Sequence, residues 1–192
     1  MEIAPTVDIA ELKTWETFKS NVHQAMQSMP YDQLCKGWES KTNRTRLYFD
    51  ELFPQVASAM GYEYGKEKLF RIDGVFYRRG PSGYLVPHVF IESENDADSA
   101  GDEVYKLCCL NAPLKILFIC QEWTLDRKTE LTQDEWNYII NDFVKENHLI
   151  GILGIVVAEW DTEFKLHTFA YNAKGNLFDS EPLVIVLPEL RD

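Results

Sequence analysis

Two runs of β-branched and aromatic residues, KLFRIDGVFYRR (residues 68–79) and GYLVPHVFIESE (residues 83–94), decide the fold. The turn sequence RGPSG lies between them, so we expect two or three antiparallel strands that bend near Asp73 and Gly74. Further along, the run LKILFIC (residues 114–120) is short and apolar throughout, as is typical of a strand buried on both faces. These segments predict a mixed sheet.

Apolar residues at helical spacing predict helices around this sheet. Segments 14–30 and 43–60 are expected to be helical, and Pro54 should kink or divide the second of them. After the sheet strands, Asp98 or Ser99 can cap a helix that ends near residue 110.

The last third of the chain predicts one more helix and further strands. Thr132 and Glu135 have the spacing of a capping box at the start of a helix. Strands are expected at 150–160, 163–172 and 183–187, with a hairpin turn at WDTE (160–163). The resulting order of elements defines an α/β fold with a mixed central β-sheet flanked by helices.

Length and composition favour a single globular domain. The chain has 192 residues, of which 45% are hydrophobic, and it contains no apolar run of ~18 residues that could span a membrane. Its first ten residues lack a secretory pattern, so an intracellular, cytoplasmic protein without membrane contact is expected. The four cysteines show no C-x-x-C pair and the four histidines are scattered, which favours buried thiols over a zinc site.

The charge of the chain is unevenly distributed. The net charge is −12, which argues against a protein that coats nucleic acid non-specifically. Residues 36–80, however, carry nine basic and six acidic side chains. This segment is the one expected to meet an anionic partner.

Three carboxylates are predicted to converge at the end of the third strand. Glu92 and Glu94 lie two residues apart, so they share one face of the strand about 7 Å from each other. Asp73, at the bend of the preceding strand, can lie next to Glu92. Such an oxygen-rich pocket suits Mg²⁺ or Mn²⁺, although the solvated end of an edge strand would also tolerate paired glutamates.

The series FRIDGVF, PHVFIESEN, DEVYKL and APLKILFIC resembles the PD-(D/E)XK nuclease superfamily, also called the restriction-endonuclease-like fold. The resemblance covers about residues 40–120 and implies an αβββαβ core, here with additional C-terminal strands. Asp73 matches the aspartate of the family and Glu92 its second acid. Glu94 stands where the family usually has lysine.

This resemblance implies a metal-dependent endonuclease. Mg²⁺ (or Mn²⁺) would be held by Asp73, Glu92 and the carbonyl of Ser93, and either Glu94 or Lys106 would orient the attacking water. Lys106, on the following helix, can replace the missing lysine or serve only as an ion-pair partner.

Other features of the family are absent or less defined. The first core helix has no glutamate at the expected place, which leaves Glu39 and Glu51 as weak candidates. DNA is the expected substrate, and a homodimer or a protein partner is expected to supply target affinity. The predicted phosphate contacts are basic residues of the first core helix and the hairpin: Arg44, Arg46, Arg71, Arg78 and Arg79.

Two functions therefore remain open: a metal-dependent nuclease, and a catalytically silent nuclease-fold module within a larger complex. Both fit a single domain that has a helical extension (1–38), a nuclease-like core (39–120) and a C-terminal helix with strands (121–192).

Overall fold

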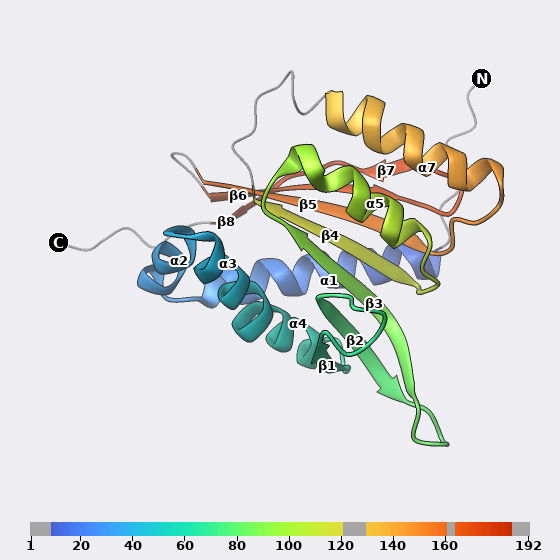
Figure 1. Ribbon diagram of the computed structural model, residues 1–192. Coiled ribbons are helices and arrows are strands. Elements are labelled where there is room, and N and C mark those ends of the chain that lie inside the picture. Colours follow the sequence, from blue (N-terminus) through green and yellow to red (C-terminus); the bar gives the residue numbers. More distant parts are fainter. Residues whose placement is uncertain (1–8, 121–129, 161–163, 186–192) are drawn as a thin grey trace.

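The computed structural model describes residues 9–120, 130–160 and 164–185, which form three layers (Figure 1). An eight-stranded mixed sheet forms the middle layer. The helices from the N-terminal part of the chain cover one face of the sheet, and two later helices cover the other. The predicted α/β fold with a mixed central sheet between helices is confirmed.

The strands follow one another across the sheet almost in chain order, β1-β2-β3-β4-β5-β6-β7, with β8 also paired to β6. β3, β4 and β5 are parallel, and all the other pairs are antiparallel. The bounds are β1 (Glu63–Lys66), β2 (Gly74–Arg79), β3 (Leu85–Glu94), β4 (Leu114–Cys120), β5 (Ile152–Trp160), β6 (Phe164–Tyr171), β7 (Leu177–Asp179) and β8 (Leu183–Ile185).

The helices fall into two groups. On one face lie α1 (Ile9–Ser28), α2 (Tyr31–Trp38), α3 (Lys41–Arg46), a π-helical segment (Leu47–Leu52) and α4 (Phe53–Ala59). On the other face lie α5 (Ala100–Cys108) and α7 (Trp136–Lys145). Pro54 stands in the first turn of α4, directly after the π-helical segment, so the predicted division of this helix is found.

Each face of the sheet has its own hydrophobic core. Along β3, Val89 and Ile91 belong to the core under α1 and α4, whereas Phe90 belongs to the core under α5 and α7. Since successive side chains of a strand alternate between faces, Glu92 follows Phe90 and points toward α5. The alternation of β3 thus places the first candidate carboxylate under a helix instead of in solvent.

The prediction of a strand beginning at Lys68 is wrong. Residues 67–73 form a loop, and β1 lies earlier, at Glu63–Lys66. The reason is conformational: Glu67, Phe70 and Arg71 have φ angles of 50°, 54° and 57°, which no β-strand accommodates.

Neither of the two predicted helix starts is capped as expected. Ser99 stands at the N-cap position of α5, as predicted, but its side chain makes no capping hydrogen bond. The side chain of Asp96 instead caps the turn before α5 by accepting a hydrogen bond from the backbone N–H of Asp98. Thr132 lies inside a π-helical segment, Glu130–Glu135, that precedes α7. Helix α2 and strand β7 were not predicted, and the WDTE turn lies mostly outside the described residues.

Two further expectations meet the structure here. Among the described residues, the structure has no helix with both the length and the hydrophobicity of a membrane-spanning segment. All four cysteines are free thiols; Cys108 is buried, as predicted, but Cys109 is exposed.

Candidate functional site

The structure brings Asp73 next to the end of β3. Gly74, the first residue of β2, pairs with Ile91, so Asp73 lies opposite Glu92. The carboxylate of Asp73 accepts a hydrogen bond from the backbone N–H of Ser93 at 3.0 Å. The juxtaposition of Asp73, Glu92 and Ser93 that the sequence predicted is therefore present.

Glu92 is an unusual carboxylate because it is only 2% exposed. Its Oε1 atom lies 2.5 Å from Nζ of Lys106 on α5, although the alignment is poor for a hydrogen bond. Burial, with the nearby charges of Asp73 and Glu103, raises the pKa of Glu92 to about 8, and Lys106 only partly offsets this.

Lys106 connects two carboxylates. In addition to Glu92, its ammonium group lies 3.4 Å from Oε2 of Glu103, one turn earlier on α5. Burial disfavours the charged form of Lys106, but the close contacts with the carboxylates of Glu92 and Glu103 outweigh it, and the pKa of Lys106 is raised. Lys106 therefore stays protonated beside Glu92 at neutral pH.

The charges of this cluster leave room for a cation. When all its groups are ionised, Asp73, Glu92 and Glu103 oppose the single positive charge of Lys106, a formal balance of −2. In the described part of the chain, no three His, Cys, Asp or Glu side chains are grouped so as to hold a metal. Mg²⁺, however, is commonly held by one or two carboxylates and completed by water and substrate phosphate, and Asp73 with Glu92 fits this pattern.

Glu94 has a different environment from the one predicted. Its Oε1 atom accepts hydrogen bonds from the backbone N–H groups of Asn95 (2.6 Å) and Asp96 (3.1 Å). The carboxylate thus fixes the loop that leaves β3. Lys106, not Glu94, is the side chain at contact distance from Glu92; a water-orienting role for Glu94 stays a prediction.

A pocket of about 230 Å³ opens next to Asp73 and Ser93. The predicted first core helix, which the structure divides into α3, the π-helical segment and α4, contributes Thr45 and Phe49 to its wall, and β1 with the following loop contributes Lys66 and Glu67. Neither of the glutamates proposed for that helix lines the pocket. Glu39 accepts a hydrogen bond from Asn43 at 3.4 Å, and Glu51 lines a different pocket.

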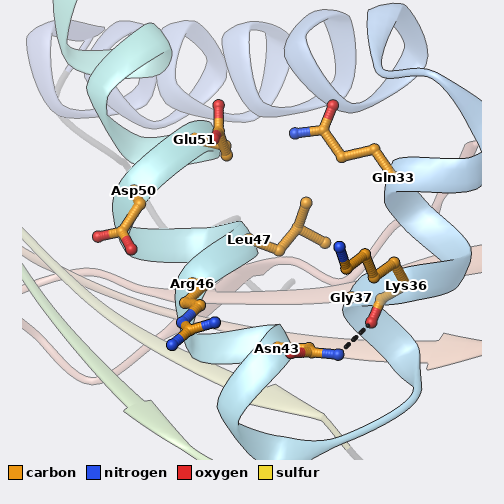
Figure 2. Close-up of a pocket in the computed structure, with 8 residues that line it drawn as sticks. All are labelled: Gln33, Lys36, Gly37, Asn43, Arg46, Leu47, Asp50 and Glu51. Atoms are coloured by element: carbon orange, nitrogen blue, oxygen red, sulfur yellow. Dashed lines mark hydrogen bonds between the residues drawn. The ribbon is translucent and has the colours of Figure 1, made fainter.

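That other pocket, of about 290 Å³, lies between α2, α3 and the π-helical segment (Figure 2). Lys36 of α2 lines one side of it, and Arg46, Asp50 and Glu51 line the facing side. It does not include Asp73, although it is comparable in size to the pocket beside Asp73 and Ser93, and Glu92 lines neither of the two pockets. Of these two pockets, the one of about 230 Å³ contains candidate metal ligands, Asp73 and Ser93.

Three of the five arginines predicted to bind phosphates have partners within the chain. Arg44 donates to the side chain of Asn95 at 3.3 Å, Arg79 pairs with Glu63 at 3.2 Å, and Arg78 lies 4.7 Å from the ring centroid of Tyr62. The remaining two are Arg46, at the pocket of Figure 2, and the exposed Arg71.

Sequence reasoning missed two contributors to this site. Glu103 is not among the predicted site residues, although its spacing of three residues from Lys106 on a helix already indicates that both side chains face the same way. The left-handed loop before Asp73 left no signal, because Phe70 and Arg71 are residues that rarely adopt positive φ.

Comparisons with known proteins do not name a family. No family model matches the chain, and no curated protein does. The central domain of yeast acetyl-CoA carboxylase is similar at 8% identity and a TM-score of 0.40, over 88% of this chain and 34% of that one. A carbon-nitrogen hydrolase from Helicobacter pylori G27 is similar at 13% identity and a TM-score of 0.35, over 91% and 84%.

This chain thus spans about a third of the length of the carboxylase chain. With TM-scores this low, neither structure supports an inference about the function of this chain.

Proposed function

We propose that the chain is a metal-dependent nuclease that hydrolyses phosphodiester bonds of DNA. The observation that carries this proposal is the position of Lys106, 2.5 Å from the buried carboxylate of Glu92, with Asp73 held beside them through Ser93. A lysine supplied by the following helix stands in for the one that the E-x-E sequence lacks. The order of helix, three strands, helix and strand around it supports the same reading.

Each side chain then has a distinct role. Asp73, Glu92 and the carbonyl of Ser93 would hold Mg²⁺ or Mn²⁺. The bound cation would polarise the scissile phosphate and lower the pKa of a water molecule. The ammonium of Lys106 would orient that water or hold a phosphate oxygen, and Glu103 keeps this ammonium charged and in place.

The test is cleavage of labelled double-stranded DNA, single-stranded DNA and RNA in Mg²⁺, Mn²⁺ or EDTA. We expect metal-dependent cleavage of DNA that is lost in Asp73→Asn and Glu92→Gln. Glu63→Gln is the matched control, because Glu63 is an exposed carboxylate on β1 whose partner is Arg79. Equal cleavage by wild type and both site variants would contradict the proposal.

A second candidate is a catalytically silent nuclease-fold module in a larger complex. It is favoured by the first core helix, which places Thr45 and Phe49, and no glutamate, at the pocket beside Asp73. It is also favoured by the net charge of −12. This candidate predicts a folded protein that cleaves none of the three substrates and that elutes with another protein.

Either candidate requires a source of target affinity. We propose that a homodimer or a protein partner provides it, because three of the five predicted arginines are already engaged within the chain. Light scattering during gel filtration tests self-association, and a monomer at high concentration would contradict the homodimer.

A further inference from the structure

The loop that joins β1 to β2 carries an unusual backbone. Glu67, Phe70 and Arg71 all have left-handed φ angles, between 50° and 57°. For residues other than glycine, asparagine and aspartate, each such angle commonly lowers the free energy of unfolding by about 1 kcal/mol or more. Glycine would satisfy the same turn at less cost.

The loop is nevertheless well held. The N–H of Glu67 donates to the carbonyl of Asp73 at 3.1 Å, and the N–H of Ile72 donates to the carbonyl of Leu69 at 3.0 Å. Ile72 is buried in the core under α5, and Leu69 packs against it. These contacts fix the residues on both sides of Phe70 and Arg71.

The two side chains at those positions point outward. Phe70 is 69% exposed, and Arg71 is also exposed. Neither is needed to fill the core, yet each stands where glycine would be less strained. A strained backbone that presents an aromatic ring and a guanidinium to solvent is the kind of feature found at ligand contacts.

Their location relates them to the carboxylates. The ring of Phe70 lies edge-on to that of Phe90, with centroids 6.0 Å apart, and Phe90 precedes Glu92 by two residues on the same face of β3. Arg71 precedes Asp73 by two residues. The exposed ring therefore lies over the face of β3 that carries Glu92, and the guanidinium belongs to the loop that leads into Asp73.

We propose that Phe70 stacks on an unpaired nucleobase next to the scissile bond, and that Arg71 contacts the neighbouring phosphate. The proposal rests on the proposed function for the site and specifies its substrate: DNA that is single-stranded, or frayed, at the point of cleavage. In an intact duplex, the faces of the bases are covered by their neighbours, so an aromatic ring can bind a base only when that base is unstacked.

Binding in EDTA, where no cleavage occurs, tests the inference directly. The probe is a single-stranded 15-mer with 2-aminopurine near its centre, compared with the same sequence as a duplex. Stacking on one base corresponds to about 5- to 100-fold in affinity, so Phe70→Ala should weaken single-strand binding by that factor and abolish quenching of the fluorophore. Phe70→Trp should retain both the single-strand affinity and the quenching. The affinity of Phe70→Ala for the duplex should stay within about twofold of wild type.

Tyr84→Ala is the matched control. Tyr84 is 78% exposed, but it lies at the β2–β3 hairpin, at the other end of β3 from Glu92 (Figure 1). The Tyr84→Ala protein should bind the single strand and the duplex as wild type does. Equal loss in Phe70→Ala and Tyr84→Ala, or no loss in Phe70→Ala, would overturn the proposal.

Arg71→Gly separates a ligand contact from a structural role. Glycine relieves the left-handed strain, so the melting temperature should rise, while the slope of log affinity against log salt should decrease by about 0.7 for the single strand. A lower melting temperature with an unchanged salt slope would overturn the phosphate contact.

The outcomes also separate this inference from the proposed function. Single-strand binding that depends on Phe70, in a protein that cleaves nothing, would support the contact and contradict the nuclease. Cleavage that depends on Asp73, with binding indifferent to Phe70, would support the nuclease and overturn the contact.

Discussion

Two carboxylates on opposite faces of the sheet have largely shielded side chains and a lysine nitrogen at 2.5 Å, yet their pKa values shift in opposite directions. Asp179 of β7 faces α1, and Glu92 of β3 faces α5. Their side chains are 8% and 3% exposed. The pKa of Asp179 is lowered, whereas that of Glu92 is raised to about 8.

Asp179 is surrounded by donors. Lys19 and the indole N–H of Trp15 both donate to Oδ2 at 2.5 Å, the backbone N–H of Glu181 donates to Oδ1 at 3.1 Å, and the hydroxyl of Thr168 lies at 3.4 Å. Burial alone would raise its pKa, but these hydrogen bonds and the charge of Lys19 outweigh it. This carboxylate serves the fold, since it ties α1 to the edge of the sheet.

Glu92 has a single cationic partner and two anionic neighbours. Lys106 lowers the pKa of Glu92, but by less than burial and the charges of Asp73 and Glu103 raise it. A buried carboxylate that its surroundings leave unsatisfied is typical of functional sites. The contrast teaches that the number of donors around a carboxylate, more than its burial or the presence of a lysine, separates a structural ion pair from a candidate cation site.

The largest expected difference between the two carboxylates is in catalysis. Glu92→Gln should lower metal-dependent cleavage by about 100-fold or more, because a metal ligand supplies several kcal/mol of transition-state stabilisation. Asp179→Asn, measured per folded molecule, should cleave as wild type does. A comparable loss of activity in both variants would remove the distinction.

Stability should show the reverse order. Asp179→Ala is expected to lower the free energy of unfolding by about 3–5 kcal/mol, because it leaves the buried ammonium of Lys19 without its partner. Glu92→Gln should cost nothing, or raise stability by about 1 kcal/mol, because it removes a carboxylate that burial disfavours. Urea unfolding at pH 8 measures both, and a larger loss in Glu92→Gln would break the comparison.

The two carboxylates should also give opposite pH dependences. The folded pKa of Glu92, about 8, lies above its ordinary value of 4.5, so its contribution favours folding at low pH and is lost as the pH rises from about 4.5 to 8. The stability gained by Glu92→Gln should therefore grow across that window and level off above it. Urea unfolding of wild type and Glu92→Gln at pH 5, 6, 7, 8 and 9 measures this difference in the free energy of unfolding. A difference that stays constant over this range would contradict the raised pKa.

For Asp179 the sign is opposite. Its folded pKa lies below the ordinary value of 3.8, so its stabilising contribution is present above pH 3.8 and is lost as the pH falls through the folded value. The cost of Asp179→Asn should be constant from pH 5 to 8 and diminish in more acidic solution, as acid unfolding of both proteins would reveal.

The smallest effect is expected at an exposed ion pair. Arg79 and Glu63 lie 3.2 Å apart, with about half of each side chain exposed, and such pairs contribute about 0–1 kcal/mol. Glu63→Gln should shift the free energy of unfolding by less than about 1 kcal/mol and leave cleavage unchanged. A larger shift would mean that a short distance between charges is enough to stabilise the fold, so the stabilising effect of the pair of Lys19 and Asp179 would not depend on its burial or on its additional donors.

The sequence predicted those parts of the fold that depend on local patterns. Alternation along 89–94 and the apolar run at 114–120 identify β3 and β4 correctly, because burial of one or both faces of a strand determines which of its residues are apolar. It failed at residues 67–73, where Leu69, Phe70 and Ile72 look like strand residues. Their backbone angles are set by tertiary contacts that no periodicity records.

The candidate site was predicted in part for the same reason. The pairing of Asp73 with Glu92 follows from an antiparallel hairpin, and the reach of Lys106 follows from a helix that packs over β3. The orientation of Glu94 toward its own backbone could not be predicted, because it depends on the dihedral angles of the next two residues. The partner of Arg44 is 51 positions away in the chain.

The central claim is that Asp73 and Glu92 form a divalent-cation site. Calorimetric titration with Mn²⁺ at pH 8 tests it most directly, on wild type, Asp73→Asn, Glu92→Gln and the control Glu63→Gln. We predict binding by wild type and Glu63→Gln that is lost in both site variants, with proton release that increases below pH 8 as Glu92 gives up its proton. No binding to wild type, or binding that is unchanged in Asp73→Asn and Glu92→Gln, would contradict the account.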